Sequence, residues 1–154
     1  MIIKDDFLSE KELAEYQNMC KTKSFNLQTI EYDNLDKGSK KIIDFAKQYY
    51  DFANLNICEM WTNYNTVTPV LHTDHDMVHF IKTGEEKYPI CTIIFYPLVE
   101  DVIGGKLKIK NQEVEPKTNR LVCFPKGVPH QVQSFIGTRV SVVYNPWSYD
   151  IRIS

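Results

Sequence analysis

The sequence lacks the marks of several protein classes. Its 154 residues hold 18 basic and 20 acidic side chains, without the strong positive charge of a dedicated nucleic-acid binder, so no nucleic-acid partner is expected. No apolar run approaches the ~20 residues that a membrane-spanning helix needs, so no membrane partner is expected either. The opening stretch, MIIKDDFLSEKEL, has no apolar region of the signal-peptide type, which predicts a cytoplasmic protein.

The cysteines form no recognisable framework. There are four of them, widely spaced and without a CxxC pair: Cys20, Cys58, Cys91 and Cys123. Three lie in apolar runs, where a buried, reduced thiol is the usual state. The rest of the composition is that of a folded protein, with 43% hydrophobic and 25% charged residues. The length predicts one domain over residues 1–154.

Two kinds of pattern divide the chain. Ser9 and Glu12 form a capping box at the start of a helix, and residues 36–52 carry an apolar stripe at helical spacing. From residue 56 onward, short β-type runs alternate with glycine and proline. We therefore predict a mainly β fold with N-terminal helices (α+β), in which a helical support (1–55) precedes a jelly-roll, cupin-like core (56–148). The expected strands span 57–64, 88–98, 106–110, 120–124, 130–133 and 138–144.

The stretch LHTDHDMVHF, residues 71–80, concentrates histidine and aspartate. On a strand, His72 and Asp74 would point to the same side. A His-x-Asp pair supplies two of the three ligands of the 2-His-1-carboxylate triad that binds non-haem Fe(II). Taken alone, the pair fits a solvated surface loop equally well.

Two later residues extend this pattern. His130 is the one histidine that follows His79, and it precedes a predicted strand. Arg139 shares a strand face with Ser141 and Val143. An arginine facing a barrel interior is costly unless it meets an anion, and its planar fork suits a carboxylate. The alternative is an edge strand with Arg139 in water.

Together these motifs resemble the prolyl 4-hydroxylase-like branch of the 2-oxoglutarate/Fe(II)-dependent dioxygenases. The likeness covers most of the chain. Its most specific part is VEPKTNRLVCFPKGVPHQVQSFIGTRVSVVYNPW, and further matches are IIKDDFLSEKEL, MWTNY before HTD, and TIIFYPL before GGKLKI. The resemblance implies a double-stranded β-helix fold.

The resemblance also implies roles for individual residues. His72, Asp74 and His130 would be the metal ligands, and with Arg139 they would form the catalytic set. Arg139 would bind the distal carboxylate of 2-oxoglutarate. The residues implied as further cofactor contacts are Tyr96, Tyr64 and Ser141. Some family members have a threonine four residues after the arginine, where this chain has Val143.

The implied activity is that of an oxidoreductase, a hydroxylase that uses Fe(II), dioxygen and 2-oxoglutarate, with ascorbate as a candidate reductant. A peptidyl (prolyl) residue is the nearest substrate analogy, and another protein or small-molecule substrate is the alternative. The rival interpretation is a cupin-like metal- or sugar-binding barrel without oxygenase activity, which would need neither Arg139 nor 2-oxoglutarate. The sequence does not define the oligomeric state.

The remaining polar residues of the histidine-rich stretch are assigned no metal. We expect His75, Asp76 and His79 to contact substrate or solvent. On a helix, His75 and His79 would share one face, but Gly84 and the charged residues 82–87 favour a loop. Residues 76–87 are therefore expected to form a lid beside the iron.

Overall fold

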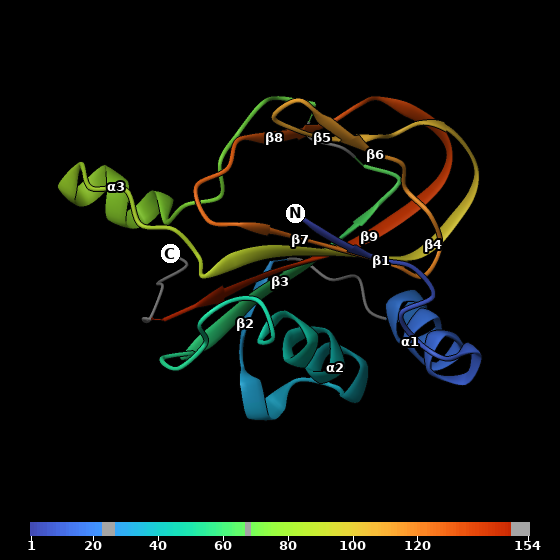
Figure 1. Cartoon of the computed structure of the whole chain (residues 1–154), viewed down its shortest axis with the longest axis horizontal. Coiled ribbons are helices and arrows are strands. Elements are labelled where there is room, and N and C mark those ends of the chain that lie inside the picture. The colour runs from blue at the N-terminus through green and yellow to red at the C-terminus, as the bar shows by residue number, and fades with distance from the viewer. Residues whose placement is uncertain (23–26, 67–68, 149–154) are drawn as a thin grey trace.

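The computed structural model describes residues 1–22, 27–66 and 69–148. Two antiparallel sheets face each other, and Figure 1 shows helices α1 and α2 on the outer side of the larger sheet. The larger sheet has the strand order β1–β7–β4–β9–β3–β2 and the smaller sheet β6–β5–β8. The described helices are α1 (Glu10–Thr22), the 3-10 turn η1 (Tyr32–Asn34), α2 (Lys37–Ala46) and α3 (Met77–Thr83). The described strands are β1 (Ile2–Lys4), β2 (Gln28–Glu31), β3 (Ile57–Tyr64), β4 (Cys91–Gly104), β5 (Leu107–Ile109), β6 (Gln112–Val114), β7 (Arg120–Pro125), β8 (His130–Val132) and β9 (Phe135–Trp147).

Strand alternation gives the larger sheet two buried faces. On β4, Ile93 and Phe95 join the cluster under the helices, whereas Ile94 and Tyr96 join the cluster between the two sheets. The same alternation continues on the neighbouring strands because successive side chains point to opposite faces. The central strands are therefore largely apolar on both faces, and the buried polar residues among them stand out: Thr92 on β4, and Arg139, Ser141 and Asn145 on β9.

Local sequence signals account for several elements. The capping box at the start of α1 is confirmed, because Glu12 N donates to Ser9 Oγ and Ser9 N donates to Glu12 Oε1, both at 3.2 Å. The predicted strand at 57–64 has the bounds of β3. Helix α2 ends at Ala46, short of the predicted residue 52, and Tyr49 is exposed. All four cysteine thiols are free, and three of them are buried.

The front of the chain is less helical than the sequence indicated. Residues 1–55 were expected to form a helical support, but they also contribute β1 and β2, which pair with β7 and β3 at the two edges of the larger sheet. Strand β6 was also not expected. These strands have three or four residues each, too few for period-two alternation to stand out.

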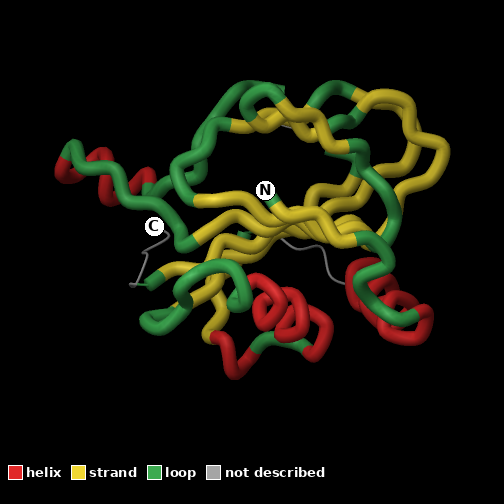
Figure 2. Tube along the Cα trace, viewed as in Figure 1, coloured by secondary structure: helices red, strands yellow, loops and turns green. Residues whose placement is uncertain are grey.

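Helix α3 corrects a second expectation. Residues 77–83 were expected to be part of a loop, yet they form a helix that projects from the side of the core in Figure 2. Asp76 caps its first turn by accepting a hydrogen bond from His79 N, and Gly84 ends it with a φ of +74°. Among the described residues, no helix is long and apolar enough to cross a membrane.

Candidate metal centre and arginine pocket

The structure brings His72, Asp74 and His130 together. The backbones of His72 and His130 form an isolated bridge, with two N–H to O hydrogen bonds of 3.0 and 2.8 Å. His72 Nε2 lies 3.6 Å from Asp74 Oδ1, and His130 Nε2 lies 3.7 Å from Asp74 Oδ2. One ligand atom from each of the three residues lies within 4.8 Å of the others. Outside this bridge residues 71–74 form no strand, and His72 and Asp74 nevertheless line one cavity.

Hydrogen bonds set the tautomers of both histidines. His72 Nδ1 lies 2.9 Å from the carbonyl of Val70, and His130 Nδ1 lies 3.0 Å from the carbonyl of Val128. A carbonyl accepts only, so each Nδ1 carries a proton, and in the neutral ring the lone pair is on Nε2. Burial lowers the pKa of His130, which favours the neutral ring. Both Nε2 atoms are thus prepared to bind a metal cation.

The carboxylate has a partner that the sequence did not reveal. Thr92 Oγ1, on β4, donates a hydrogen bond of 2.9 Å to Asp74 Oδ2. The threonine is 2% exposed, so its position is set by the core. Only strand alternation hinted at this residue, because Thr92 shares the face of Tyr96.

Arg139 is a buried cation whose partners carry no charge. It is 2% exposed, which excludes the solvated edge-strand alternative. Its Nε donates to Gly105 O at 3.2 Å, its Nη1 to Ser141 Oγ at 3.4 Å and its Nη2 to the Tyr96 hydroxyl at 3.3 Å. No carboxylate of the described residues pairs with it. A desolvated guanidinium of this kind is stabilised by an anion.

A cavity of about 90 Å³ joins the histidine–aspartate cluster to Arg139. Ser141 and Val143 line it beside Arg139, as their shared strand face predicted, and Trp61 and Asn63 line it from β3. The cavity therefore has a cation at one end and three metal-type ligands at the other.

The structure places Tyr96 next to Arg139 but places Tyr64 away from the cavity. The hydroxyl of Tyr96 meets Arg139, as described above. Tyr64 is 60% exposed and lines a separate pocket with Pro97 and Val140, so it does not reach the cavity. The reason is alternation: Trp61 and Asn63 occupy the face of β3 that faces the smaller sheet, and Tyr64 occupies the other. Asn63 stands where the tyrosine was expected.

Two residues missed by the sequence analysis support Arg139. Asn65 Oδ1 accepts a hydrogen bond of 2.8 Å from the backbone N–H of Arg139. Gly105 has a φ of +71°, and a Cβ added there would lie 3.1 Å from Arg139 Cδ. Glycine at this position therefore allows the left-handed backbone conformation and also leaves room for the Arg139 side chain.

The other polar residues of the histidine-rich stretch make local contacts. Asp76 caps α3, and His79 Nε2 lies 3.0 Å from Glu85 Oε2. His75 precedes the helix, so it does not share a helical face with His79. It lines a second pocket, together with Asp74. Neither histidine belongs to the ligand cluster.

Comparison with solved structures identifies the fold. A prolyl-4-hydroxylase from Pseudomonas putida aligns with a TM-score of 0.68 at 16% identity, over 97% of this chain and 92% of that one. The fold is that of the prolyl hydroxylases. A prolyl hydroxylase from Trichoplax adhaerens, in complex with a peptide fragment of the hypoxia inducible factor oxygen degradation domain, aligns with a TM-score of 0.61 at 14% identity, over 96% and 83%.

The viral collagen prolyl hydroxylase from Paramecium Bursaria Chlorella virus-1, as its 2-oxoglutarate complex, aligns with a TM-score of 0.57 at 12% identity, over 97% of this chain and 96% of that one. No protein-family model and no curated protein sequence matches this chain. The resemblance found in the sequence motifs is confirmed at the level of the fold.

Proposed function

We propose that the chain is a non-haem Fe(II)- and 2-oxoglutarate-dependent dioxygenase that hydroxylates its substrate. It would form a single domain over residues 1–154 with a double-stranded β-helix core. Residues 23–26, 67–68 and 149–154 of this domain lie outside the described part. Two observations support the proposal: the histidine–aspartate cluster and the buried arginine at the far end of the same cavity.

The donor set fits a divalent iron. Two imidazole nitrogens with free lone pairs and one carboxylate form the ligand set of non-haem Fe(II) oxygenases, which leaves the remaining positions for co-substrates. Asp74 also reduces the positive charge that the metal would bring into a partly buried site. His72, Asp74 and His130 would hold the metal, and the bound iron would supply the activation of dioxygen.

Arg139 is the observation that carries the proposal. Its guanidinium is buried and lacks a carboxylate partner among the described residues, so it favours an anionic ligand in the adjoining cavity. The distal carboxylate of 2-oxoglutarate has the charge and the planar shape to pair with it. Ser141 and Tyr96 would hold the guanidinium in place, and the hydroxyl of Ser141, which lines the cavity, would remain able to donate to the carboxylate.

The protein's own contribution is orientation and exclusion of water. Thr92 orients the Asp74 carboxylate, and the carbonyls of Val70 and Val128 orient the two imidazoles. Ile94, Val132 and Val143 form the apolar part of the cavity wall. Such a wall strengthens the electrostatic interactions inside because it excludes water.

A peptide is the substrate class that the structural neighbours favour, because one of them is bound to a peptide fragment. The rival function, a cupin-like barrel without oxygenase activity, would also explain the metal ligands. That function does not explain why a buried arginine without a carboxylate partner lies next to the metal ligands. For that reason we favour the oxygenase.

The test is an anaerobic titration of the purified protein with Fe(II) and 2-oxoglutarate, followed by the visible charge-transfer band of the chelate. We expect a band in the wild type and none in Asp74→Ala. Glu100→Gln, which removes an exposed carboxylate that does not line the cavity, should behave as the wild type. Tight metal binding without a band would contradict the proposal and favour the cupin-like barrel.

A further inference from the structure

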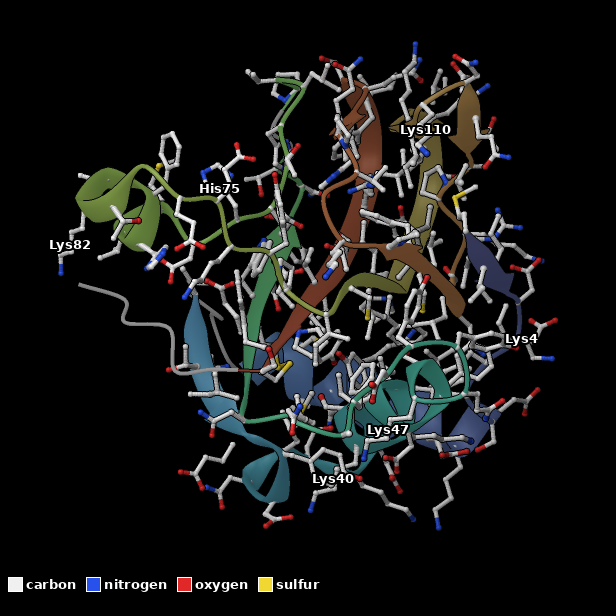
Figure 3. The ribbon with its side chains drawn as sticks, turned by 60° about the vertical axis from the view of Figure 1, so that its left-hand side comes forward. Lys4, Lys40, Lys47, His75, Lys82 and Lys110 are labelled. Atoms are coloured by element: carbon white, nitrogen blue, oxygen red, sulfur yellow. The ribbon has the colours of Figure 1, made fainter. Side chains whose placement is uncertain are left out.

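A second pocket shares Asp74 with the cavity of the metal centre but is not lined by Arg139. Its volume is about 400 Å³, and its lining includes Glu59, Trp61, Asp74, His75 and Asn145. Trp61 and Asp74 also line the cavity of the metal centre, so the two spaces adjoin. Figure 3 shows His75 on the segment that leads to α3, whereas Lys82 lies at the outer end of that helix and points away from the core. A ligand in this pocket would lie beside the metal.

Asn145 is a buried acceptor without a donor. It is 2% exposed, and its Oδ1 has no hydrogen-bond partner. In the described part of the chain, only three buried side-chain atoms share this condition, and all three belong to residues that line this pocket. A buried polar atom without a partner is costly, which suggests that a ligand completes the site.

His75 supplies a second acceptor. Its Nδ1 lies 3.1 Å from the carbonyl of Thr73, so this nitrogen carries a proton, and in the neutral ring Nε2 offers a lone pair. That Nε2 is buried and has no partner. The third such atom, Thr62 Oγ1, can both donate and accept, and strand alternation places it on the face of Met60. Thr62 therefore does not alter the excess of hydrogen-bond acceptors in the pocket.

Glu59 adds a charged acceptor. It lies on β3 directly across from Asn145 on β9, and Trp147 Nε1 donates to its Oε2 at 3.2 Å. Burial raises the pKa of Glu59, and the nearby charges of Asp74 and Asp76 raise it further. Apart from His75, no basic residue is among the described residues that line the pocket. The site is thus rich in acceptors, and Glu59 and Asp74 supply its carboxylates.

We infer that this pocket binds a cationic, donor-bearing group of the substrate, an alkylammonium or a guanidinium. This inference rests on the proposed function, and it deepens it by assigning the substrate class. A group of this kind offers several N–H donors to the acceptors of Glu59, Asn145 and His75. A prolyl ring offers none, so it would leave the same acceptors unpaired. The residue placed beside the metal would therefore carry a basic side chain.

The test compares four probes by isothermal titration calorimetry under argon, with the protein loaded with Mn(II) and 2-oxoglutarate. The cationic probes are the Nα-acetyl methylamides of lysine and arginine. The neutral controls are the same derivatives of norleucine and proline. We expect at least one cationic probe to bind about tenfold or more tightly than norleucine, since a hydrogen bond to a charged group contributes about 1.5–3 kcal/mol and 1.4 kcal/mol is tenfold.

Matched variants locate the effect. Glu59→Gln keeps the shape of the side chain and removes its charge, and it should weaken the cationic probe about tenfold. Asn145→Leu removes the buried acceptor and provides a second test if Glu59→Gln does not fold. Glu100→Gln removes an exposed charge elsewhere and should bind as the wild type.

The outcomes separate this inference from the proposed function. Equal or tighter binding of norleucine or proline would overturn the inference, as would cationic binding that neither Glu59→Gln nor Asn145→Leu weakens. The 2-oxoglutarate affinity, measured on the same samples, reports on the proposed function alone. If that co-substrate fails to bind, the probe titrations repeated on the metal-free protein still decide whether the pocket selects cations.

Discussion

Thr92 and Asp74 form a hydrogen-bonded pair, in which Thr92 Oγ1 donates to Asp74 Oδ2 at 2.9 Å. Asp74 itself is only partly buried, so packing alone does not fix its side chain. The hydrogen bond from Thr92 holds one carboxylate oxygen and thereby keeps the carboxylate oriented toward the two histidines. Partners that orient a metal ligand typically contribute about 10- to 100-fold in metal affinity. Thr92 is therefore a positioning residue for the candidate metal centre.

We expect Thr92→Val to weaken Fe(II) binding by about 10- to 100-fold, because valine keeps the shape of threonine but cannot hold the carboxylate. Thr92→Ser retains the hydroxyl and should restore most of the affinity. The measurement is an anaerobic Fe(II) titration competed by a metal indicator. If Thr92→Val and the wild type bind Fe(II) equally, the positioning role is wrong.

Gly105 couples the backbone to Arg139. In Gly105→Ala, the new Cβ would lie 3.1 Å from Arg139 Cδ and 3.3 Å from its Nε. Since the guanidinium must then move, we expect 2-oxoglutarate affinity to fall about tenfold or more, as when a charged hydrogen bond is lost.

Gly84→Ala is the matched control for that substitution. Gly84 has a similar φ of +74°, but a Cβ there meets nothing within 4 Å. This variant should show only the backbone cost, about 1 kcal/mol in the free energy of unfolding, with unchanged 2-oxoglutarate affinity. Equal loss of 2-oxoglutarate affinity in both glycine variants would show that packing against Arg139 is not the cause.

A buried hydroxyl network stabilises the helical side of the sheet. Tyr144, on β9, shares hydrogen bonds with the hydroxyl of Tyr16 and with Ser39 Oγ, and Ser39 in turn donates to Asp36. Tyr144→Phe leaves two buried hydroxyls with fewer partners. We expect the free energy of unfolding to fall by about 1–3 kcal/mol.

Chemical denaturation would measure this change. Tyr49→Phe, at a tyrosine that is 51% exposed, should alter the free energy of unfolding by less than about 0.5 kcal/mol. Because Tyr144 faces away from the cavity, 2-oxoglutarate affinity should stay at the wild-type level. A large loss of 2-oxoglutarate affinity in Tyr144→Phe would contradict the assignment of the two faces.

Asp5, which follows β1, forms an ion pair with Arg120 of β7, and the strength of this pair depends on pH. Its carboxylate accepts two hydrogen bonds from Arg120, of 2.6 and 2.9 Å, and the arginine lowers the pKa of Asp5 to about 2. A lowered folded-state pKa contributes stability above the unfolded value of about 4, and that stability is lost as the pH falls toward 2.

We therefore expect Asp5→Asn to be less stable than the wild type at pH 7, and the difference to shrink below pH ~4. The side chain is 36% exposed, so solvent screening limits the effect to roughly 1 kcal/mol. Urea denaturation at several pH values measures it, with Asp6→Asn as the control. A difference that persists unchanged at pH 3 would show that the ion pair is not its source.

Local periodicity explains what could be predicted. Arg139, Ser141 and Val143 were placed on one strand face, and in the structure all three line the cavity. The capping box at Ser9 and the bounds of β3 followed from equally local signals. These features depend only on residues a few positions apart.

Features that depend on distant pairing could not be predicted. Glu59 meets Asn145 only because β3 and β9 pair in one register, and Thr92 meets Asp74 only because the histidine-rich segment folds over β4. Tyr64 was assigned to the site by resemblance, although one step of alternation carries it to the other face. Helix α3 was missed although Met77, Phe80 and Ile81 recur at helical spacing, because it has only seven residues and the adjoining Gly84 and charged residues favoured a loop.

The central claim is that Arg139 holds the distal carboxylate of 2-oxoglutarate beside a metal. A four-way comparison tests it most directly: the affinities of 2-oxoglutarate and 2-oxopentanoate for the Mn(II)-loaded wild type and for Arg139→Gln. 2-Oxopentanoate carries a methyl group in place of that carboxylate. The account predicts that the wild type prefers 2-oxoglutarate by about tenfold or more, and that Arg139→Gln loses the preference. A preference that survives in Arg139→Gln would contradict it.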